Sequence, residues 1–178
     1  RARALTTDTT INDMDPDKRR AGLPRLKEGI GEAYELGAKG FAVLSGKYEE
    51  ATREQSYAAL KDSTAQRCDH AATMGDMPVL LEVFDYDFDK KSLIGPAPLA
   101  RRFADDMKCR PHHFVLMVDL SHILQIHASL RDHILPIAPY VRHAHLANVV
   151  MQSDAEAVGS LNPRFGYPKS DIGVEAVM

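Results

Sequence analysis

The chain has 178 residues, 44% of them hydrophobic and 26% charged, with a formal net charge of −3 at pH 7. This length allows one domain with a core of its own over residues 1–178, and the slightly acidic balance gives no electrostatic reason to expect nucleic acid as a partner. No apolar run reaches the roughly 20 residues of a transmembrane helix, and two cysteines are too few for a disulfide framework, so we expect a cytoplasmic protein with reduced thiols and no membrane partner.

The first half of the chain shows two helical patterns, each followed by a short apolar run. Apolar residues at helical spacing in "DPDKRRAGLPRLKEGIGEAYELGAKG" predict a helix that Gly37 could end. The run 41–46 reads as a strand closed by a turn, 49–75 as a long amphipathic helix, and 78–84 as a buried strand. The segment "LSGKYEE" after the first of these strands lacks the G-x-G-x-x-G spacing, which argues against a nucleotide site.

The second half continues the alternation, with a helix at 97–108, a strand at 113–119, a helix at 121–135 and a strand at 140–150. Strands that are apolar on both faces and are each followed by a helix indicate a parallel sheet covered by helices. Both a doubly wound sheet and a (β/α)8 barrel satisfy this pattern.

Polar residues follow three successive predicted strands at the point where each one ends. Glu82 lies near the end of the first, Asp119 closes the next with His122 just beyond it, and the third carries His143 and His145. Because the carboxyl ends of parallel strands lie on one face of a barrel, we expect these side chains to converge. Two acids and a histidine from three strands form a candidate metal site.

Structural roles compete with this interpretation at several positions. Asp119 could cap a helix that begins at Ser121, and His122 could simply lie in the first turn of that helix. Either His143 or His145 could be a core histidine, and we favour His145 as the ligand. The segment "DYDFDKK" (85–91) is expected to be a solvated connection, although Tyr86 or Asp87 could line the mouth of the site.

With these motifs, the chain resembles the xylose-isomerase-like family of sugar phosphate isomerases and epimerases. The resemblance runs from about Ala33 to Val177, and it is best in "EAYELGAKGFAVLSGKYEE", "LLEVFDYDFDKKSLIGP", "LMVDLSH", "RHAHLAN" and "NPRFGYPKSDIGVEAV". Its most specific part is the Asp-x-x-His at one strand exit, with a Glu one strand earlier and a His one strand later. It implies a (β/α)8 TIM-type barrel, of which this sequence shows strands three to six clearly and lacks the first and the last.

The resemblance also implies one divalent metal held by Glu, Asp, His and Glu at the C-terminal mouth of the barrel. Glu82, Asp119 and His145 match the first three ligands, and His122 matches a histidine that contacts substrate. The fourth ligand has no candidate, because Glu175 lies in what reads as the start of a helix rather than at a strand end. Asn162 stands where a His would be expected before "PRFGYP".

Three further side chains are candidates for substrate binding: Lys47 after the strand at 41–46, Tyr86, and Arg164, a looser match to a basic residue of the family. The oxygen-rich ligand set suits Mn²⁺, Mg²⁺ or Co²⁺, and Zn²⁺ is an option. The family chemistry is proton transfer through an enediolate, with Glu82 and His122 as the catalytic residues. Relatives are often homo-oligomers.

Three functions follow. The first is a metal-dependent isomerase or epimerase of a sugar or sugar phosphate. The second is a truncated or degenerate barrel that acts as a non-catalytic binding module. The third is a metal-dependent phosphodiesterase of the apurinic endonuclease type, which needs further histidines that the strand ending "VLSG" does not supply.

Overall fold

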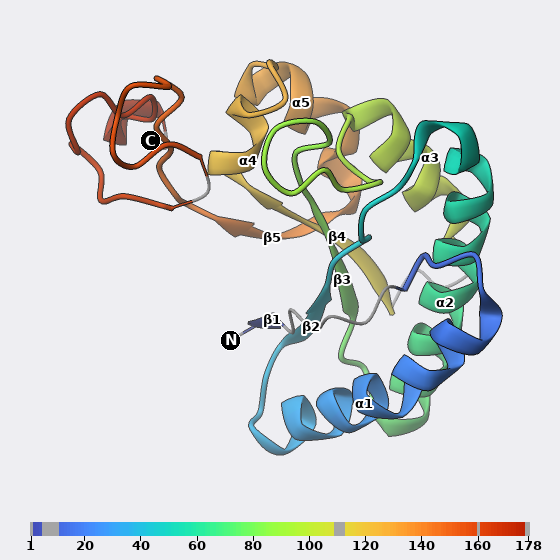
Figure 1. The fold of residues 1–178 in the computed structure, drawn as a ribbon. Coiled ribbons are helices and arrows are strands. Elements are labelled where there is room, and N and C mark those ends of the chain that lie inside the picture. Colours follow the sequence, from blue (N-terminus) through green and yellow to red (C-terminus); the bar gives the residue numbers. More distant parts are fainter. Residues whose placement is uncertain (1, 5–10, 109–112, 160, 177–178) are drawn as a thin grey trace.

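The computed structural model describes residues 2–4, 11–108, 113–159 and 161–176, with residues 2–4 described by their backbone alone. Five parallel strands form one sheet in the order β1-β2-β3-β4-β5, which is also their order in the sequence. Their bounds are Ala2–Ala4 (β1), Gly40–Val43 (β2), Val79–Val83 (β3), Phe114–Asp119 (β4) and Val141–His145 (β5). Neighbouring parallel strands in sequence order are the pattern of a barrel wall, as the partial TIM barrel requires (Figure 1).

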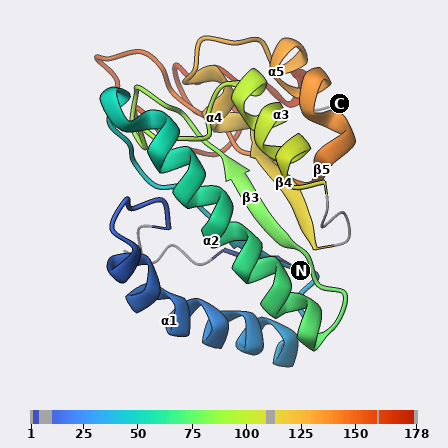
Figure 2. The ribbon, with the colours of Figure 1, turned by 90° about the vertical axis from the view of Figure 1, so that its right-hand side faces the viewer.

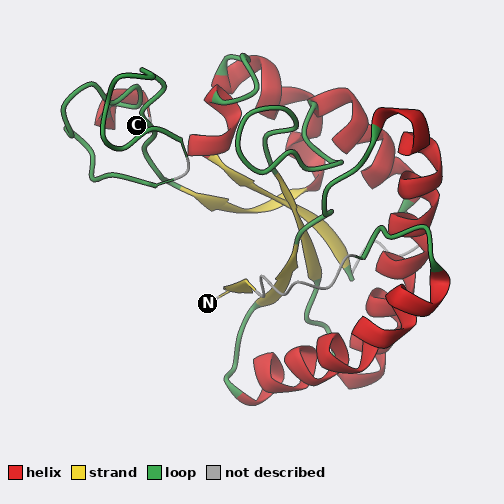
Figure 3. Ribbon diagram, in the orientation of Figure 1, coloured by secondary structure: helices red, strands yellow, loops and turns green. Residues whose placement is uncertain are grey.

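The helices connect the strands and lie on one face of the curved sheet (Figure 3). They are α1 (Pro16–Glu35), α2 (Arg53–Met74), α3 (Ala97–Asp106), α4 (Leu120–Leu124) and α5 (Leu130–Ile137), with 3-10 turns η1 (Glu50–Thr52), η2 (Ala138–Tyr140) and η3 (Val174–Ala176). α1 begins at a capping Asp15, whose side chain accepts a hydrogen bond from the Asp17 amide. None of the helices in the described ranges is long and apolar enough to cross a bilayer.

The core divides into two layers because side chains alternate across each strand. Phe41, Leu81 and Leu116 belong to the main apolar cluster, which packs under the helices. On the opposite face, a small buried cluster consists of Ala42, Leu80, Val115 and Met117. This second face is the one that continues into the polar residues at the strand ends.

The helix predicted at 121–135 is wrong in its continuity, because the structure has two helices there, α4 and α5. His127 between them has a left-handed backbone with φ of 57°. Ser129 then starts α5 as its N-cap, and its hydroxyl accepts a hydrogen bond of 3.0 Å from the Asp132 amide. A cap inside a helical pattern marks a new helix, and this signal was missed.

The strand predicted at 140–150 is also too long, since β5 ends at His145 and irregular chain follows. Conversely, the short strand β1 pairs with β2, whereas the first strand that the sequence pattern predicts is the one at 41–46. Glu175, expected at the start of a helix, lies in the single 3-10 turn η3. Of the two cysteines, Cys68 is buried, and Cys109 lies outside the described residues.

His133 in α5 gives a testable consequence of burial. Its side chain is 2% exposed, and its Nε2 finds no hydrogen-bond partner within the described residues. Burial lowers the pKa of His133 from 6.5 to about 4. The unfolded chain therefore takes up a proton first as the pH falls below 6.5, and folding stability is lost progressively down to pH 4, by up to about 3 kcal/mol.

We expect His133→Leu to remove this part of the acid sensitivity, as measured by urea unfolding between pH 7 and pH 4.5. The exposed His127 provides a matched control, and His127→Asn should leave the pH dependence as it is in the parent protein. If His133→Leu lost stability just as steeply with falling pH, His133 would not be the group responsible for the acid sensitivity.

Candidate metal centre

Two neighbouring strands deliver the two carboxylates of the site. Glu82 follows Leu80 by two residues in β3, and Asp119 follows Met117 by two residues in β4, so all four side chains lie on the same face of the sheet. The register pairs Leu80 with Val115 and Glu82 with Met117. The buried apolar layer thus fixes the height at which each acid emerges at the carboxyl ends of the strands.

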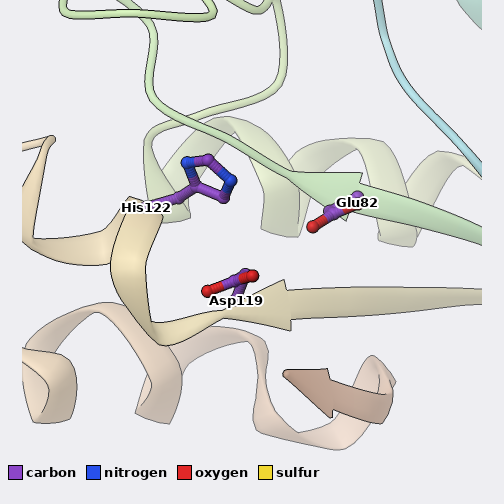
Figure 4. Close-up of side chains that lie close together, drawn as sticks. All are labelled: Glu82, Asp119 and His122. Atoms are coloured by element: carbon purple, nitrogen blue, oxygen red, sulfur yellow. The ribbon is translucent and has the colours of Figure 1, made fainter. Parts of the chain in front are cut away.

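Glu82, Asp119 and His122 form a compact buried group. A ligand atom from each lies within 4.8 Å of a ligand atom of the other two, and Figure 4 shows the three side chains around a common space. They are 5%, 3% and 4% exposed, respectively. The His122 ring lies against Phe84, with ring centroids 4.1 Å apart. Three donors this close together can meet one cation after small side-chain movements.

His145 joins the same group from β5. Its Nδ1 is 3.5 Å from Asp119 Oδ2 and 4.0 Å from Glu82 Oε1. β5 places it opposite Asp119 in the sheet register. The side chain is 44% exposed, so this ligand borders the open side of the site. His143, two residues earlier on the same face, stacks edge-on against His145 with centroids 5.0 Å apart.

Asp119 caps α4, and this contact leaves one of its carboxylate oxygens for the role of a metal ligand that the sequence predicts. Its Oδ1 accepts hydrogen bonds from the Ser121 amide at 2.9 Å and the Ser121 hydroxyl at 2.7 Å, which caps α4. Its Oδ2 is the oxygen nearest to His145. Capping therefore fixes the carboxylate, and the second oxygen remains directed toward the cluster.

Burial strongly perturbs the pKa of Glu82. Desolvation, and after it the neighbouring Asp119 charge, raises the pKa of Glu82 to about 8. Burial also lowers the pKa of His122 below its usual value, which favours the neutral imidazole that can bind a metal. Two buried carboxylates next to each other are unfavourable together unless a proton or a cation lies between them.

Two residues near the site escaped the sequence interpretation, Asp85 and Lys90. Asp85 is fully buried, and its Oδ1 accepts amide hydrogen bonds from residues 88–91 at 2.6–3.3 Å, so it is not part of a solvated connection as expected. Its Oδ2 lies 3.8 Å from His122 Nδ1. The charge of Lys90 acts to lower the pKa of Glu82. A carboxylate directly after a buried strand was the available signal for Asp85.

The predicted substrate-binding residues lie in less defined surroundings. Lys47 and Arg164 have exposed side chains, and Tyr86 is partly buried. The backbone of Lys47 bridges to Ser92, and the Arg164 carbonyl accepts a hydrogen bond from Asn148. Within the described ranges, no hydrogen bond or ion pair joins these three side chains to the carboxylates, and their roles stay predictions.

The donor set fits a divalent cation. Carboxylate oxygens and an imidazole nitrogen are ligands of Mn²⁺, Co²⁺ and Zn²⁺, and Mg²⁺ takes mainly the oxygens. The raised pKa of Glu82 also favours a cation site. Without metal the carboxyl group keeps its proton to about pH 8, and a bound cation would stabilise the deprotonated carboxylate in its place. Glu82, Asp119 and His145, with His122 beside them, are the residues that would hold the metal.

Comparisons with known proteins agree with this architecture. A model of the xylose isomerase-like TIM barrel family matches residues 4–178. A search of curated protein sequences gives no match. Among solved structures, 3-keto-D-glucoside 4-epimerase from E. coli superposes with a TM-score of 0.67 at 19% identity, over 82% of this chain and 57% of its own.

Two further solved structures each give a TM-score of 0.64. One is D-allulose 3-epimerase from Methylomonas sp. in complex with D-allulose, at 20% identity over 86% of this chain and 54% of its own. The other is a family 2 AP endonuclease from Brucella melitensis, at 17% identity over 74% and 50%. The chain therefore spans about half the length of the solved structures it matches, and at these identities the likeness is one of fold.

Proposed function

Since this chain belongs to the xylose isomerase-like TIM barrel family, we propose that it carries the metal-binding part of an isomerase or epimerase that acts on a sugar or sugar phosphate. The convergence of Glu82, Asp119, His122 and His145 at the carboxyl ends of β3, β4 and β5 is the observation that supports this function. The solved neighbours include two epimerases of sugars.

The bound metal, Mn²⁺, Mg²⁺ or Co²⁺ in this proposal with Zn²⁺ as an option, would supply Lewis acidity toward the carbonyl and hydroxyl oxygens of an open-chain sugar. Glu82 as a carboxylate removes the proton from the carbon next to the carbonyl. The electron pair of that C–H bond forms the enediolate, and His122 stabilises its charge by a hydrogen bond. Protonated Glu82 then returns the proton to the neighbouring carbon, and the remaining hydroxyl proton passes from the oxygen that becomes the new carbonyl to the former carbonyl oxygen, which completes an isomerisation.

Epimerisation needs a second acid–base group on the opposite face of the substrate. No further acid of the described residues belongs to the metal-binding group of Glu82, Asp119 and His122. Glu82 alone accounts for proton transfer on one face of the substrate. The cluster by itself therefore supports isomerisation more directly than epimerisation. Lys47, Tyr86 and Arg164 are proposed to contact the sugar hydroxyls or a phosphate.

We further propose that the protein works in the cytoplasm, as a homo-oligomer, on a small molecule rather than on nucleic acid. The formal charge of −3 supports the last point, because binding to a phosphate backbone relies on basic surfaces.

Incubation of the Mn²⁺-loaded protein with a panel of ketoses, aldoses and their phosphates tests the function. We expect conversion of at least one sugar, and in D₂O we expect deuterium at the carbon next to its carbonyl by ¹H NMR. Removal of the metal with EDTA should stop both, and added Mn²⁺ should restore them. A protein that binds Mn²⁺ and neither converts nor exchanges any sugar would instead indicate a non-catalytic binding module.

A further inference from the structure

Arg67 of α2 is buried, and within the described part of the chain its guanidinium forms no ion pair. The residue is 1% exposed, and it is among the largest fully buried side chains of the described chain. Its Nη1 donates to the Ser63 carbonyl one turn earlier in the same helix. Its Nε is buried and meets no acceptor in the part of the chain that the structure describes. No carboxylate of the described residues forms an ion pair with this guanidinium, a costly arrangement for a charged group.

A cavity adjoins Arg67 between α1 and α2, two helices that lie side by side in the outer layer (Figure 2). Its volume is about 170 Å³, more than ten times the roughly 10–15 Å³ that a single water requires. The polar residues that line it are Arg19, Arg20, Asp62, Ser63, Gln66 and Arg67. Three arginines therefore line one cavity, with a single carboxylate among its lining residues.

The existing contacts leave this cavity with excess positive charge. Arg19 donates to the carbonyls of Asp13 and Met14, and its Nη2 lies 3.9 Å from Asp62. The Asp62 carboxylate also accepts a hydrogen bond from Gln66 at 3.0 Å, and its side chain is 59% exposed. Arg20 pairs with Asp17, which does not line the cavity. Of these carboxylates, Asp62 acts on the charge of Arg67 without forming an ion pair with it, and it also serves Arg19 and Gln66.

We propose that this cavity binds a phosphate group, either free or carried by a small metabolite. A tetrahedral dianion accepts hydrogen bonds in several directions at once, and guanidinium groups match its oxygens in pairs. Arg67 supplies the buried donor, Arg19 and Arg20 supply charge at the entrance, and Ser63 and Gln66 add neutral polar groups. The burial that lowers the pKa of Arg67 to about 10 still leaves it charged at neutral pH.

This site lies in the helical layer, away from the carboxyl ends of the strands, so it makes no use of the metal ligands. Its occupation would tie α1 to α2, and so would regulate or stabilise the protein rather than take part in proton transfer. Phosphate binding at this cavity is therefore independent of any sugar chemistry at the ends of the strands.

Calorimetric titration at constant ionic strength tests it, with inorganic phosphate and glycerol 3-phosphate as probes and acetate as a comparison. We expect saturable phosphate binding to the parent protein and at least tenfold weaker binding to Arg67→Met. Because Arg67→Met alters a buried position, the double variant Arg19→Gln/Arg20→Gln provides a second test on more exposed residues, with the same expected loss. Tighter binding of the ester than of the free ion would identify a metabolite as ligand, and equal binding would identify free phosphate.

Arg25→Gln is the matched control, because Arg25 lies on α1 with an exposed side chain that pairs with Glu28 and Glu32. It should bind phosphate as the parent does, and Mn²⁺ affinity should be the same in all variants. Absence of saturable phosphate binding, equal affinity in the arginine variants, or acetate binding tighter than phosphate would each overturn the proposal.

Discussion

Replacing Glu82 by Gln is expected to weaken Mn²⁺ binding by about a hundredfold or more and to lower sugar turnover by about 10²–10⁴-fold. The amide keeps the shape of the side chain and removes the charge that a cation needs. It also removes the base that takes the substrate proton. Glu82 is nearly as buried as the apolar strand residues around it, so water cannot easily substitute for either role.

Mn²⁺ affinity is measured by electron paramagnetic resonance of the free ion, and turnover by the sugar panel described above. Asp119→Asn should also lower the affinity for Mn²⁺, but this variant keeps Glu82 as a base. Excess Mn²⁺ should therefore restore metal occupancy and turnover in Asp119→Asn, whereas turnover should stay low in Glu82→Gln. The exposed Glu156→Gln is the control and should match the parent in both measurements. Unchanged Mn²⁺ affinity in Glu82→Gln would remove Glu82 from the ligand set.

The sequence was sufficient for the alternation of strands and helices because the signal is strong and local. β3 and β4 are buried on both faces along their whole lengths, and such continuous apolar runs are typical of parallel strands. The break between α4 and α5 was harder to predict, because apolar residues continue across it and only Ser129 and the left-handed His127 mark the interruption. β5 ends at His145 because its partner strand β4 ends at Asp119, the residue opposite. A local sequence pattern does not show where a partner strand ends.

The candidate site was predictable where strand geometry alone decides position. Asp119 and His145 are paired in the strand register, and Glu82 lies on the same face one step earlier, opposite Met117, so the three side chains come together. Asp85 and Lys90 depend instead on the path of a loop, which is held by hydrogen bonds from several amides to one carboxylate. The buried Arg67 was not predictable, because a helical pattern with Arg at this position normally places the charge in solvent.

These positions share a physical feature: each leaves a buried charge without full compensation. Glu82 lies beside a second acid, and Arg67 lies beside a cavity. Buried charges reduce folding stability unless a partner is present, so such positions are where a ligand gains most by binding. Functional sites often reduce stability in this way, and the reduction itself can be measured in the absence of the ligand.

The metal-free protein should therefore lose stability as the pH rises from 5 to 9. Glu82 has a folded-state pKa raised from 4.5 to about 8, so its contribution to stability is fully present below pH 4.5. Between pH 4.5 and 8 the unfolded chain releases the proton and the folded chain keeps it. With about 1.4 kcal/mol for each pH unit, the expected loss is up to about 5 kcal/mol at pH 9.

Glu82→Gln should abolish this loss, because the amide has no proton to release, and the variant should be the more stable protein at pH 9 and close to the parent at pH 5. Urea unfolding with EDTA present measures the difference. Saturating Mn²⁺ should reverse the order at pH 8, because the folded parent protein binds the ion about a hundredfold or more tightly than the variant does. If parent and variant instead show the same dependence on pH without metal, Glu82 carries its charge in the folded protein at neutral pH, and the binding energy of the cation must come from geometry alone.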